Sequence, residues 1–349
     1  MEEYEVAVIG AGPAGASAAR ELERLGVDYI LMDRCSFPRS KPCAGILPPK
    51  IEELVGPLPR TVYERRIWGY HLHTASGAEF LSRFPRPGYS VDRSRFDSWL
   101  LSRLKKQPVR AEMLGASQGR DSVTVRTNTG ELKCRVLIGA DGANSRVRAV
   151  LDAAPGAMAL ACQTSIPMPP SEVRRRTQGW FHVFYIIPGG YGWVAPHRSC
   201  VRAGVGSTLS GWGAPKSLSI FLRMSKVREL TGDGECMGFE AHRIPMGGPL
   251  PILGKGRVLL AGDAGGFVFP GTGEGVRFAL LSGTLAARAA SLCLERGPGI
   301  RRIDRTYLKL LEEEGLLSLR EVDFRRVLRS PASAERYVTA LRGLSGSAC

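Results

Sequence analysis

Four residues near the start of the chain have the types and the spacing of a dinucleotide-binding site. Gly10, Gly12 and Gly15 form a GxGxxG motif, and Asp33 follows the last glycine by 18 residues. In such a motif the first glycine permits a tight turn, the second lets the backbone approach a pyrophosphate, and the third lets a helix pack on a strand. The acidic residue accepts hydrogen bonds from a ribose. NAD and FAD both use this fingerprint, so it does not choose between them.

The elements that must position these residues can be predicted from the flanking sequence. Residues 4–9 and 28–33 are apolar runs that predict two buried strands, and residues 13–25 predict a helix that ends at Gly26. Strand, helix and strand in this order predict a parallel sheet with a right-handed crossover. The phosphates of a bound dinucleotide would then meet the N–H groups at the start of the helix.

Two later segments place glycines and carboxylates directly after apolar strands. Asp141 and Gly142 follow one predicted strand, and Gly262 and Asp263 follow another. Ligands in open α/β sheets bind outside the carboxyl ends of the strands, so these residues are candidates for cofactor binding. Asp263 could accept hydrogen bonds from ribityl hydroxyls.

The glycine-rich turn that comes next favours FAD. It leads into a helix predicted at 273–295 and would direct backbone N–H groups at one end of a flavin ring. Negative charge develops there when flavin is reduced, and fixed donors stabilise that charge. The residues of this turn are Pro270, Gly271, Thr272, Gly273, Glu274 and Gly275.

Together these three segments resemble the FAD-dependent oxidoreductases of the para-hydroxybenzoate hydroxylase type. The resemblance implies an α/β (α+β) fold in which a Rossmann-like FAD-binding domain carries an inserted antiparallel-sheet substrate domain. It also implies a tightly bound, non-covalent FAD, with Ala14, Cys43, Ala44 and Gly45 among its contacts. We expect the FAD-binding domain at 1–60, 90–155 and 255–300, the substrate domain at 61–89 and 156–254, and a C-terminal helical tail at 301–349.

Two arginines are assigned through the same resemblance. Residues 89–97 are similar to the family's segment before its second helix, where an arginine contacts the cofactor, and this assigns Arg93 to FAD. Arg34 is similar to the basic residue that follows the ribose-binding acid. The alternatives are an ordinary helix start with a solvated Arg93, and a surface Arg34.

Two further segments resemble the geranylgeranyl reductase branch of this superfamily. Residues 37–45 (FPRSKPCAG) are similar to its PxxKxCxGG segment, and residues 188–196 (PGGYGWVAP) are similar to its PxxYxWxFP segment. The chain departs from these patterns at Ile46, where a second glycine is usual, and at Ala195, where an aromatic residue is usual. Members of the branch usually carry a longer C-terminal helical segment, so the resemblance implies a shortened C-terminus.

This resemblance implies reduction of C=C bonds in a hydrophobic isoprenoid-type substrate by hydride transfer from reduced flavin. An isolated alkene has no carbonyl to polarise, so hydride transfer must be coupled to proton delivery at the other carbon. The resemblance makes Cys43 the catalytic candidate, and Lys41 could lower the pKa of its thiol or hold a phosphate. A buried structural cysteine and a solvated lysine are the alternatives.

Aromatic residues suggest where a polyprenyl chain would bind. Tyr191 and Trp193 are two residues apart, so a strand would point both to one face. With Trp180 and Phe184 they could line an apolar groove, and an ordinary sheet core is the alternative. Gln163 is a further candidate near the flavin.

The net charge of the chain limits the classes of partner that we expect. The 349 residues include 48 Lys and Arg against 33 Asp and Glu, a net charge of +15, which predicts attraction to polyanions. The arginine runs are not accompanied by a nucleic-acid-binding motif, which excludes nucleic acid as the expected partner. The remaining candidates are a solvated basic face, an anionic membrane surface, a phosphorylated prenyl substrate and an acidic electron-donor protein.

Cysteine and histidine spacing predicts no metal. The eight cysteines form no CxxC pair, and His182, His197 and His242 lack the spacing of metal ligands. Cysteines this sparse are typical of a reducing compartment, so we expect a cytoplasmic protein, either free or peripheral at the membrane. A bridge between Cys35 and Cys43 stays open.

The reductant and the reaction type each leave alternatives. The sequence has no second GxGxxG, so NAD(P)H would bind transiently, or a reduced ferredoxin-like protein would donate electrons. The first alternative function is an FAD-dependent monooxygenase that hydroxylates or epoxidises a small apolar or aromatic substrate. The second is a non-catalytic flavin electron carrier. The segments at 37–45 and 188–196 favour the reductase.

Overall fold

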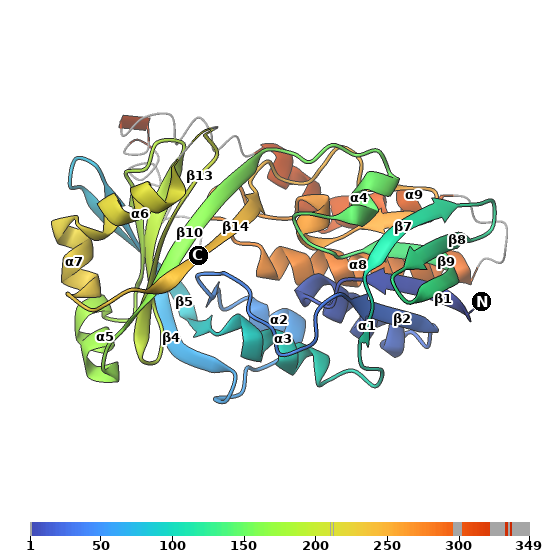
Figure 1. Cartoon of the computed structure of the whole chain (residues 1–349), viewed down its shortest axis with the longest axis horizontal. Helices are drawn as coiled ribbons and strands as arrows, with labels where there is room; N and C mark the ends of the chain where they lie inside the picture. The colour runs from blue at the N-terminus through green and yellow to red at the C-terminus, as the bar shows by residue number, and fades with distance from the viewer. Residues whose placement is uncertain are drawn as a thin grey trace. The chain divides into compact units, whose positions relative to one another are not determined.

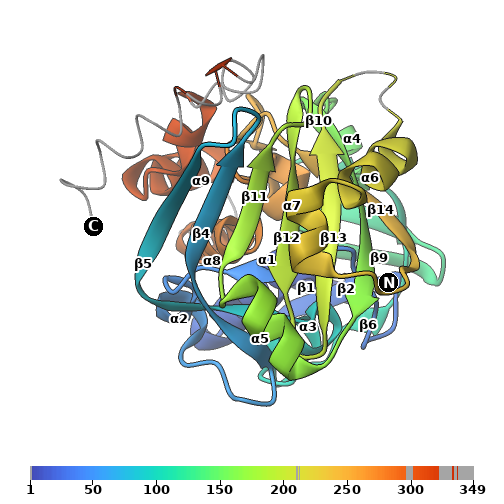
Figure 2. The ribbon, with the colours of Figure 1, turned by 90° about the vertical axis from the view of Figure 1, so that its left-hand side faces the viewer.

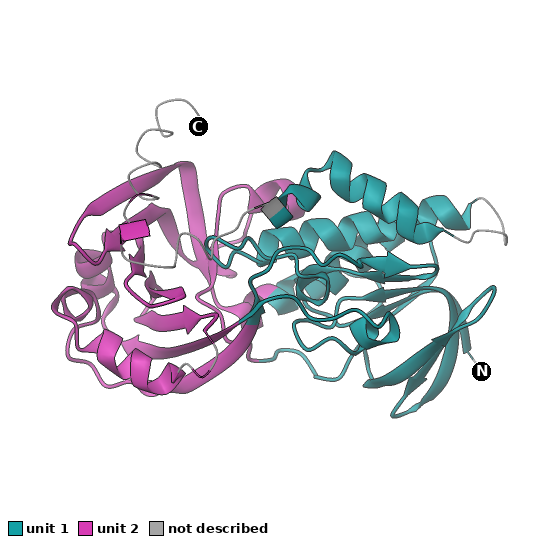
Figure 3. Cartoon of the chain, turned by 90° about the horizontal axis from the view of Figure 1, so that it is seen from above, with its two compact units in different colours: residues 1–39, 97–158, 244–322 teal, residues 40–96, 159–243, 323–349 magenta. Residues whose placement is uncertain are grey.

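The computed structural model describes residues 2–209, 211, 213–295, 302–321, 332, 333 and 336. The chain folds into two compact units, each built from discontinuous segments (Figure 3). The first unit comprises Met1–Arg39, Asp97–Met158 and Ile244–Val322, and the second comprises Ser40–Phe96, Ala159–Arg243 and Asp323–Cys349.

These boundaries differ from the predicted domains at residues 40–60 and 90–96, which we expected in the FAD-binding domain, and at residues 156–158 and 244–254, which we expected in the substrate domain. The first difference has a local cause. Strand β3 (Ile46–Leu47) pairs with Tyr89 and Ser90 of strand β5 (Glu79–Val91), so the loop that contains Cys43 belongs to the second unit.

The first unit is built on a sheet of eight strands with the order β15-β16-β9-β1-β2-β6 and a β7–β8 extension (Figure 1). Its parallel strands are β1 (Glu2–Ile9), β2 (Tyr29–Asp33), β6 (Val109–Arg110), β9 (Gly130–Gly139) and β16 (Val258–Leu260). The antiparallel strands are β7 (Met113–Gln118), β8 (Val123–Thr127) and β15 (Gly254–Lys255). The predicted βαβ unit and parallel sheet are therefore confirmed.

Two long helices of this unit pack against each other, α1 (Pro13–Arg24) and α8 (Val276–Leu294). Close approach is possible because Gly283 has no side chain: a Cβ there would lie 2.1 Å from the carbonyl oxygen of Ala14. Ser17 on α1 also donates a hydrogen bond to the carbonyl of Leu280 on α8, at 2.7 Å. By length and composition α8 alone among the described helices could cross a membrane, but its apolar window is 72% buried, as in a core helix.

Four shorter helical elements of the unit pack around these strands and long helices. They are α4 (Arg146–Val150), η1 (Gly262–Gly265), α9 (Ile303–Glu313) and η2 (Leu316–Glu321). The hydroxyl of Tyr307 on α9 donates to the buried carbonyls of Leu260, at 3.0 Å, and Ser282, at 3.2 Å. Helix α9 is thereby fastened to both a central strand and α8. The rest of the predicted C-terminal tail lies outside the described residues, apart from residues 332, 333 and 336.

The second unit is built on a sheet with the order β14-β10-β13-β12-β11-β4-β5-β3. Besides β3 and β5, its strands are β4 (Tyr63–Thr74), β10 (Met158–Pro167), β11 (Phe181–Tyr185), β12 (Gly190–Pro196), β13 (Cys200–Ser207) and β14 (Met237–Pro245). Most pairings are antiparallel, whereas β11 runs parallel to β4. The expected fold class, a Rossmann-like sheet with an inserted antiparallel substrate sheet, is confirmed.

Three helices cover one face of this second sheet (Figure 2): α5 (Pro170–Thr177), α6 (Ala214–Leu222) and α7 (Ser225–Thr231). The core beneath them is apolar and includes Phe184, Val194, Leu218, Phe221 and Val227. Along the chain, helix α2 (Ile51–Val55) precedes strand β4, and helix α3 (Arg93–Leu101) follows strand β5. Because strand residues alternate between faces, successive residues of a strand beneath these helices point alternately toward them and toward the opposite face.

Candidate active site

The GxGxxG motif forms a turn in which packing requires glycine at two positions, whereas the remaining position has space for a side chain. Gly10 has φ +98°, and a Cβ there would lie 2.3 Å from the carbonyl oxygen of Ala140. A Cβ on Gly15 would lie 1.8 Å from the carbonyl oxygen of Gly10. A Cβ on Gly12 would meet only the guanidinium of Arg39, at 3.4 Å. The open backbone at Gly12 is where a ligand can approach, as the motif predicts.

Helix α1 begins at this open position. Gly12 is its N-cap residue and no side chain caps its first turn, so the first N–H groups of the helix point outward from it. A diphosphate is the kind of group that such a helix start binds. The Arg39 side chain beside it forms an ion pair with the buried Asp97, at 3.4 Å.

Asp33 ends strand β2 next to the same turn. Its Oδ2 accepts a hydrogen bond from the N–H of Ala11, and its Oδ1 accepts one from the N–H of Cys35, both at 2.8 Å. A carboxylate has about four acceptor positions, so two remain for ribose hydroxyls. The neighbouring Arg34 is exposed, so its cofactor contact stays a prediction.

The Asp141 turn offers a buried acceptor. Its Oδ2 accepts hydrogen bonds from the N–H groups of Arg146, at 2.7 Å, and Val147, at 3.2 Å, and so caps helix α4. Its Oδ1 is buried without a hydrogen-bond partner, and burial raises the pKa of this carboxyl. A buried acceptor of this kind calls for a donor, such as a ligand hydroxyl. Next to it, Gly142 has φ +80° and open space where a Cβ would point.

The third segment begins at η1. Gly262 has φ +58° and its N–H donates to the Ser282 hydroxyl at 2.9 Å, while a Cβ on it would lie 2.9 Å from the Ala14 side chain. Gly262 therefore brings η1 against both long helices. Asp263 is half-buried beside it.

The glycine-rich stretch from Pro270 to Gly275 is a turn, and helix α8 begins at Val276 rather than at residue 273 as predicted. Gly273 has φ +70°, which a helix cannot contain and glycine readily adopts. The N–H of Phe269 donates to the carbonyl of Glu274 at 2.9 Å, which closes the turn. No side chain caps α8 at Gly275. The donors expected at the flavin are thus at an uncapped helix start.

Arg148 is a positioning residue that sequence reasoning missed. The residue is only 8% exposed, and its guanidinium donates to the carbonyls of Ala143, at 2.9 Å, and Ala264, at 3.5 Å. It therefore ties the Asp141 turn to η1. The arginine at the end of the GADGANSRVR segment was the available signal, and Arg39 was missed because its partner Asp97 is distant in sequence.

The loop around Cys43 belongs to the second unit, where polar contacts hold its main chain. The carbonyl of Cys43 accepts hydrogen bonds from Gln163, at 3.4 Å, and Arg202, at 3.3 Å. The carbonyl of Ala44 lies 2.9 Å from Nε2 of His197. Gly45 has φ +74°, and a Cβ on it would lie 2.2 Å from the carbonyl oxygen of Val91. The loop is therefore anchored, and glycine is required at its end.

The side chains of this loop are only partly covered. Cys43 is half-buried and its Sγ accepts a hydrogen bond from the N–H of Gly45 at 3.3 Å. Cys43 and Cys35 are both free thiols. Nζ of Lys41 contacts Nε2 of His242, so Lys41 is not simply solvated.

Charged groups outside the motif support the loop. Arg202 donates to Asp92 at 2.7 Å, and Gln163 donates to Glu240 at 3.0 Å. Burial alone would raise the pKa of Glu64, but its hydrogen bond to His197, at 2.7 Å, holds that pKa at about 2. Arg202, Glu240 and Glu64 were missed because they lie on strands remote in sequence from the loop.

The predicted substrate residues are not all on one face. Tyr191 and Trp193 lie together with ring centroids 6.0 Å apart, on the face opposite the helices. The Trp193 ring covers Gly204 on the next strand, where a Cβ would lie 2.2 Å from it. The indole N–H of Trp193 is buried without a partner.

The prediction that Phe184 lines a groove with Tyr191 and Trp193 is wrong. Phe184 lies on the helix-covered face, where it contacts Phe221 with ring centroids 5.3 Å apart. Strand pairing is the reason, because Trp193 is opposite Val183 and Phe184 is opposite Gly192. Trp180 precedes strand β11 and lies 5.8 Å from the guanidinium of Arg83. Phe184 therefore does not extend the Tyr191 and Trp193 surface, and the role of Trp180 in a substrate groove stays a prediction.

Arg93 begins helix α3 and is 6% exposed, so the alternative of a solvated arginine is wrong. Its contact with FAD stays a prediction.

Comparison with known proteins identifies the family. Residues 3–55 match the model of the FAD binding domain. The chain is 32% identical over 311 residues to a geranylgeranyl diphosphate reductase of Rhodobacter capsulatus, an alignment that covers 84% of this chain and 76% of the relative. The chain belongs to the geranylgeranyl reductase family of FAD-dependent oxidoreductases.

One further relative and two solved structures are also similar to this chain. A digeranylgeranylglycerophospholipid reductase of Methanosphaera stadtmanae is 26% identical, with 98% of this chain and 91% of the relative covered. The crystal structure of a geranylgeranyl bacteriochlorophyll reductase-like protein from Thermoplasma acidophilum has a TM-score of 0.83 at 21% identity, covering 97% of this chain and 91% of that one. A flavin-dependent brominase has a TM-score of 0.73 at 16% identity, which shows a shared fold.

FAD fits the first unit. The open Gly12 backbone, the uncapped start of α1, the remaining acceptor positions of Asp33 and the orphaned Asp141 oxygen match a pyrophosphate and hydroxyl-bearing ligand. These features are independent of one another. The predicted family and cofactor are therefore confirmed, while the individual contacts stay predictions.

Proposed function

We propose that this protein reduces isolated C=C bonds in the prenyl chain of a phosphorylated isoprenoid. The observation that carries the proposal is the anchored Cys43 loop in a chain that also has an FAD-binding unit. Its main chain is held by Gln163, Arg202 and His197, which keeps a half-buried thiol in a defined position. Relatives named as reductases of a prenyl diphosphate and of a prenylated phospholipid support the substrate class.

The chemistry balances with one hydride and one proton. When bound and reduced, FAD supplies the hydride to one alkene carbon. The Cys43 thiol gives its proton to the other carbon, so the π bond breaks, two C–H bonds form and a thiolate remains. The thiolate then takes a proton from water. Tyr191 and Trp193 supply an apolar surface against which a prenyl chain packs.

The net charge of +15 supports a phosphate-bearing substrate and an acidic partner. We propose that NAD(P)H or a reduced ferredoxin-like protein donates the electrons, and that the protein acts in the cytoplasm at an anionic membrane surface where prenyl lipids reside.

Anaerobic single-turnover kinetics test this function. The FAD-loaded protein is reduced without oxygen and mixed with geranylgeranyl diphosphate or a digeranylgeranyl phospholipid, and flavin reoxidation and product mass are followed. We expect reoxidation with a mass gain of two hydrogens. Reoxidation that needs oxygen and places oxygen in the product would establish the monooxygenase instead.

Two serine variants separate the role of the thiol from the presence of FAD. Cys43→Ser removes the proposed proton donor, and the exposed Cys35→Ser is its matched control. We expect Cys43→Ser to bind FAD normally and to slow alkene reduction at least about a hundredfold, within the range for general acids. Equal rates in the two variants would show that another group delivers the proton. If neither the wild type nor the variants reduce the alkene, and all of them still pass electrons from reduced flavin to an acceptor at the same rate, the protein is an electron carrier.

A further inference from the structure

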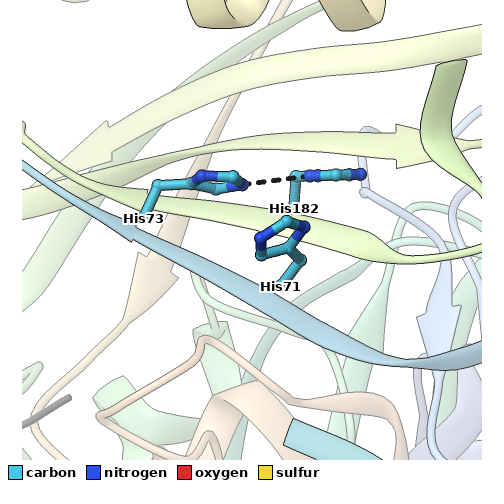
Figure 4. Close-up of side chains that lie close together, drawn as sticks. All are labelled: His71, His73 and His182. Atoms are coloured by element: carbon cyan, nitrogen blue, oxygen red, sulfur yellow. Dashed lines mark hydrogen bonds between the residues drawn. The ribbon is translucent and has the colours of Figure 1, made fainter. Parts of the chain in front are cut away.

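Three histidines of the second unit meet on the helix-covered face of its sheet (Figure 4): His71, His73 and His182. Strands β4 and β11 are parallel neighbours in which His182 is paired with His71 and Phe184 with His73. Residues 71 and 73 share a face of β4, and 182 lies on the same face of β11. One nitrogen from each ring lies within 4.8 Å of the others, and Nε2 of His73 is 3.0 Å from Nδ1 of His182.

The hydrogen bonds around the rings determine which nitrogens keep their lone pairs. Nε2 of His182 is 3.3 Å from the carbonyl oxygen of Thr177, which can only accept, so Nε2 carries the proton and Nδ1 does not. Nε2 of His71 is 2.9 Å from Oε2 of Glu79, so it donates and leaves the Nδ1 lone pair available.

His73 reaches the same arrangement by moving one proton. Because Nδ1 of His182 carries no proton, Nε2 of His73 donates the 3.0 Å hydrogen bond to it, and Nδ1 of His73 lies 3.4 Å from Oε1 of Glu79. Transfer of the His73 proton from Nε2 to Nδ1, directed at this carboxylate, would free the Nε2 lone pair for a cation. Each ring thus has an oxygen acceptor behind the nitrogen that does not face the cluster. Metal-binding histidines almost always have this outer arrangement of a carboxylate or a backbone carbonyl.

One lysine also lies beside this cluster. Lys226 lies 2.9 Å from Glu79 and opposes a cation, but its side chain is 46% exposed and can turn toward solvent.

We propose that Nδ1 of His71, Nε2 of His73 and Nδ1 of His182 bind one Zn²⁺, with water as the fourth ligand and Glu79 as the outer-shell carboxylate. Zinc bonds of about 2.0–2.1 Å in a tetrahedron place ligand nitrogens about 3.3 Å apart, so rotation of the side chains by small angles is sufficient. His71 is 18% exposed and marks the entry path. The ion links β4 to β11 on the face opposite Tyr191 and Trp193.

The sequence analysis predicted no metal because the spacing of His182, His197 and His242 is not that of a ligand set. The ligands come from two strands whose pairing is not visible in the sequence. The site is separate from the residues proposed for alkene reduction, so its test does not depend on that function.

Zinc binding is measured on the full-length, FAD-loaded protein after removal of any purification tag and treatment with a chelator. Equilibrium dialysis against micromolar ZnCl₂ and elemental analysis give the zinc content per chain. We expect one Zn²⁺ in the wild type, its loss in His71→Ala, and its retention in His242→Asn, the control for a histidine outside the cluster. His71 is chosen because its side chain is the most exposed of the three, so this variant is the most able to fold.

Two further measurements keep the result unambiguous. The described part of the chain has seven free cysteines, so Co²⁺ difference spectra are recorded: nitrogen ligation gives ligand-field bands without thiolate-to-metal charge transfer. Zinc should also raise the melting temperature of the wild type and leave that of His71→Ala unchanged, with circular dichroism confirming that the variant is folded. No zinc in the wild type, equal zinc in folded His71→Ala, or thiolate charge transfer from the wild-type site would overturn the proposal.

Discussion

In the absence of metal, the buried imidazoles of His73 and His182 should make the protein less stable as the pH falls from 7 to 5. In the native state burial lowers the pKa of His73 from 6.5 to about 4. Between these values the unfolded chain binds more protons than the native one, so the free energy of unfolding rises with pH and is lost on acidification. The window is set by the two pKa values, about 4 and 6.5.

The size of the effect follows from the same values. For one histidine with these two pKa values, integrating the proton difference from pH 7 to pH 5 gives about 2 kcal/mol. His182, with a native pKa of about 3, contributes a similar amount. The carboxyl of Glu79, whose native pKa is about 2, loses its contribution only as the pH falls through and below 4.5, so it contributes little in this interval.

Urea unfolding at pH 5 and pH 7 with a chelator present measures this difference. We expect His182→Asn to remove about half of it. Phe184→Leu is the matched control, because the Phe184 ring stacks on His73 at 4.3 Å but does not titrate. It should lower stability by the same amount at both pH values. If the wild type has equal stability at pH 5 and 7, or His182→Asn retains the full difference, the two imidazoles are not neutral in the native state.

Two further changes test the packing around the cofactor unit. Gly12→Ala adds a methyl group that meets only the Arg39 guanidinium at 3.4 Å, so the fold should survive while FAD affinity drops about tenfold, about 1.4 kcal/mol by titration. Gly15→Ala would place a Cβ 1.8 Å from a carbonyl oxygen and should cost about 3 kcal/mol or more; equal stability of the two variants would contradict this distinction. Tyr307→Phe removes the buried hydroxyl whose one proton is shared between the carbonyls of Leu260 and Ser282, and it should lower the free energy of unfolding by about 1–3 kcal/mol; an unchanged urea midpoint would show that water replaces the hydroxyl.

The features that sequence reasoning predicted best are those encoded by residues close together in the chain. The βαβ unit around Gly10 depends on short-range patterns, and it is present. The start of helix α8 was predicted three residues too early, because Gly273, at φ +70°, keeps residues 273–275 out of the helix. Local backbone conformation, rather than hydrophobicity, sets that boundary.

Long-range contacts account for what could not be predicted. Arg202 supports Cys43 from 159 residues away, and Arg148 reaches Ala264 from 116 residues away. Arginine is common at solvated surface positions, so the residue type alone did not indicate that these two side chains have a structural role. Only the strand order brings each guanidinium to a carbonyl that needs a donor.

The two faces of the second sheet show why one strand alone cannot locate a site. Alternation along β11 separates Val183 from Phe184, but it does not say which face is covered by helices. The pairing with β12 decides this: Val183 shares a face with Trp193, and Phe184 therefore shares the other face with Gly192 and Phe221. The same pairing rule, applied to β4, brings His182 to His71 across 111 residues. A groove residue was thus misassigned, and the histidine cluster was missed, for one reason: both depend on which strands are neighbours, and that information is not contained in the spacing of either strand.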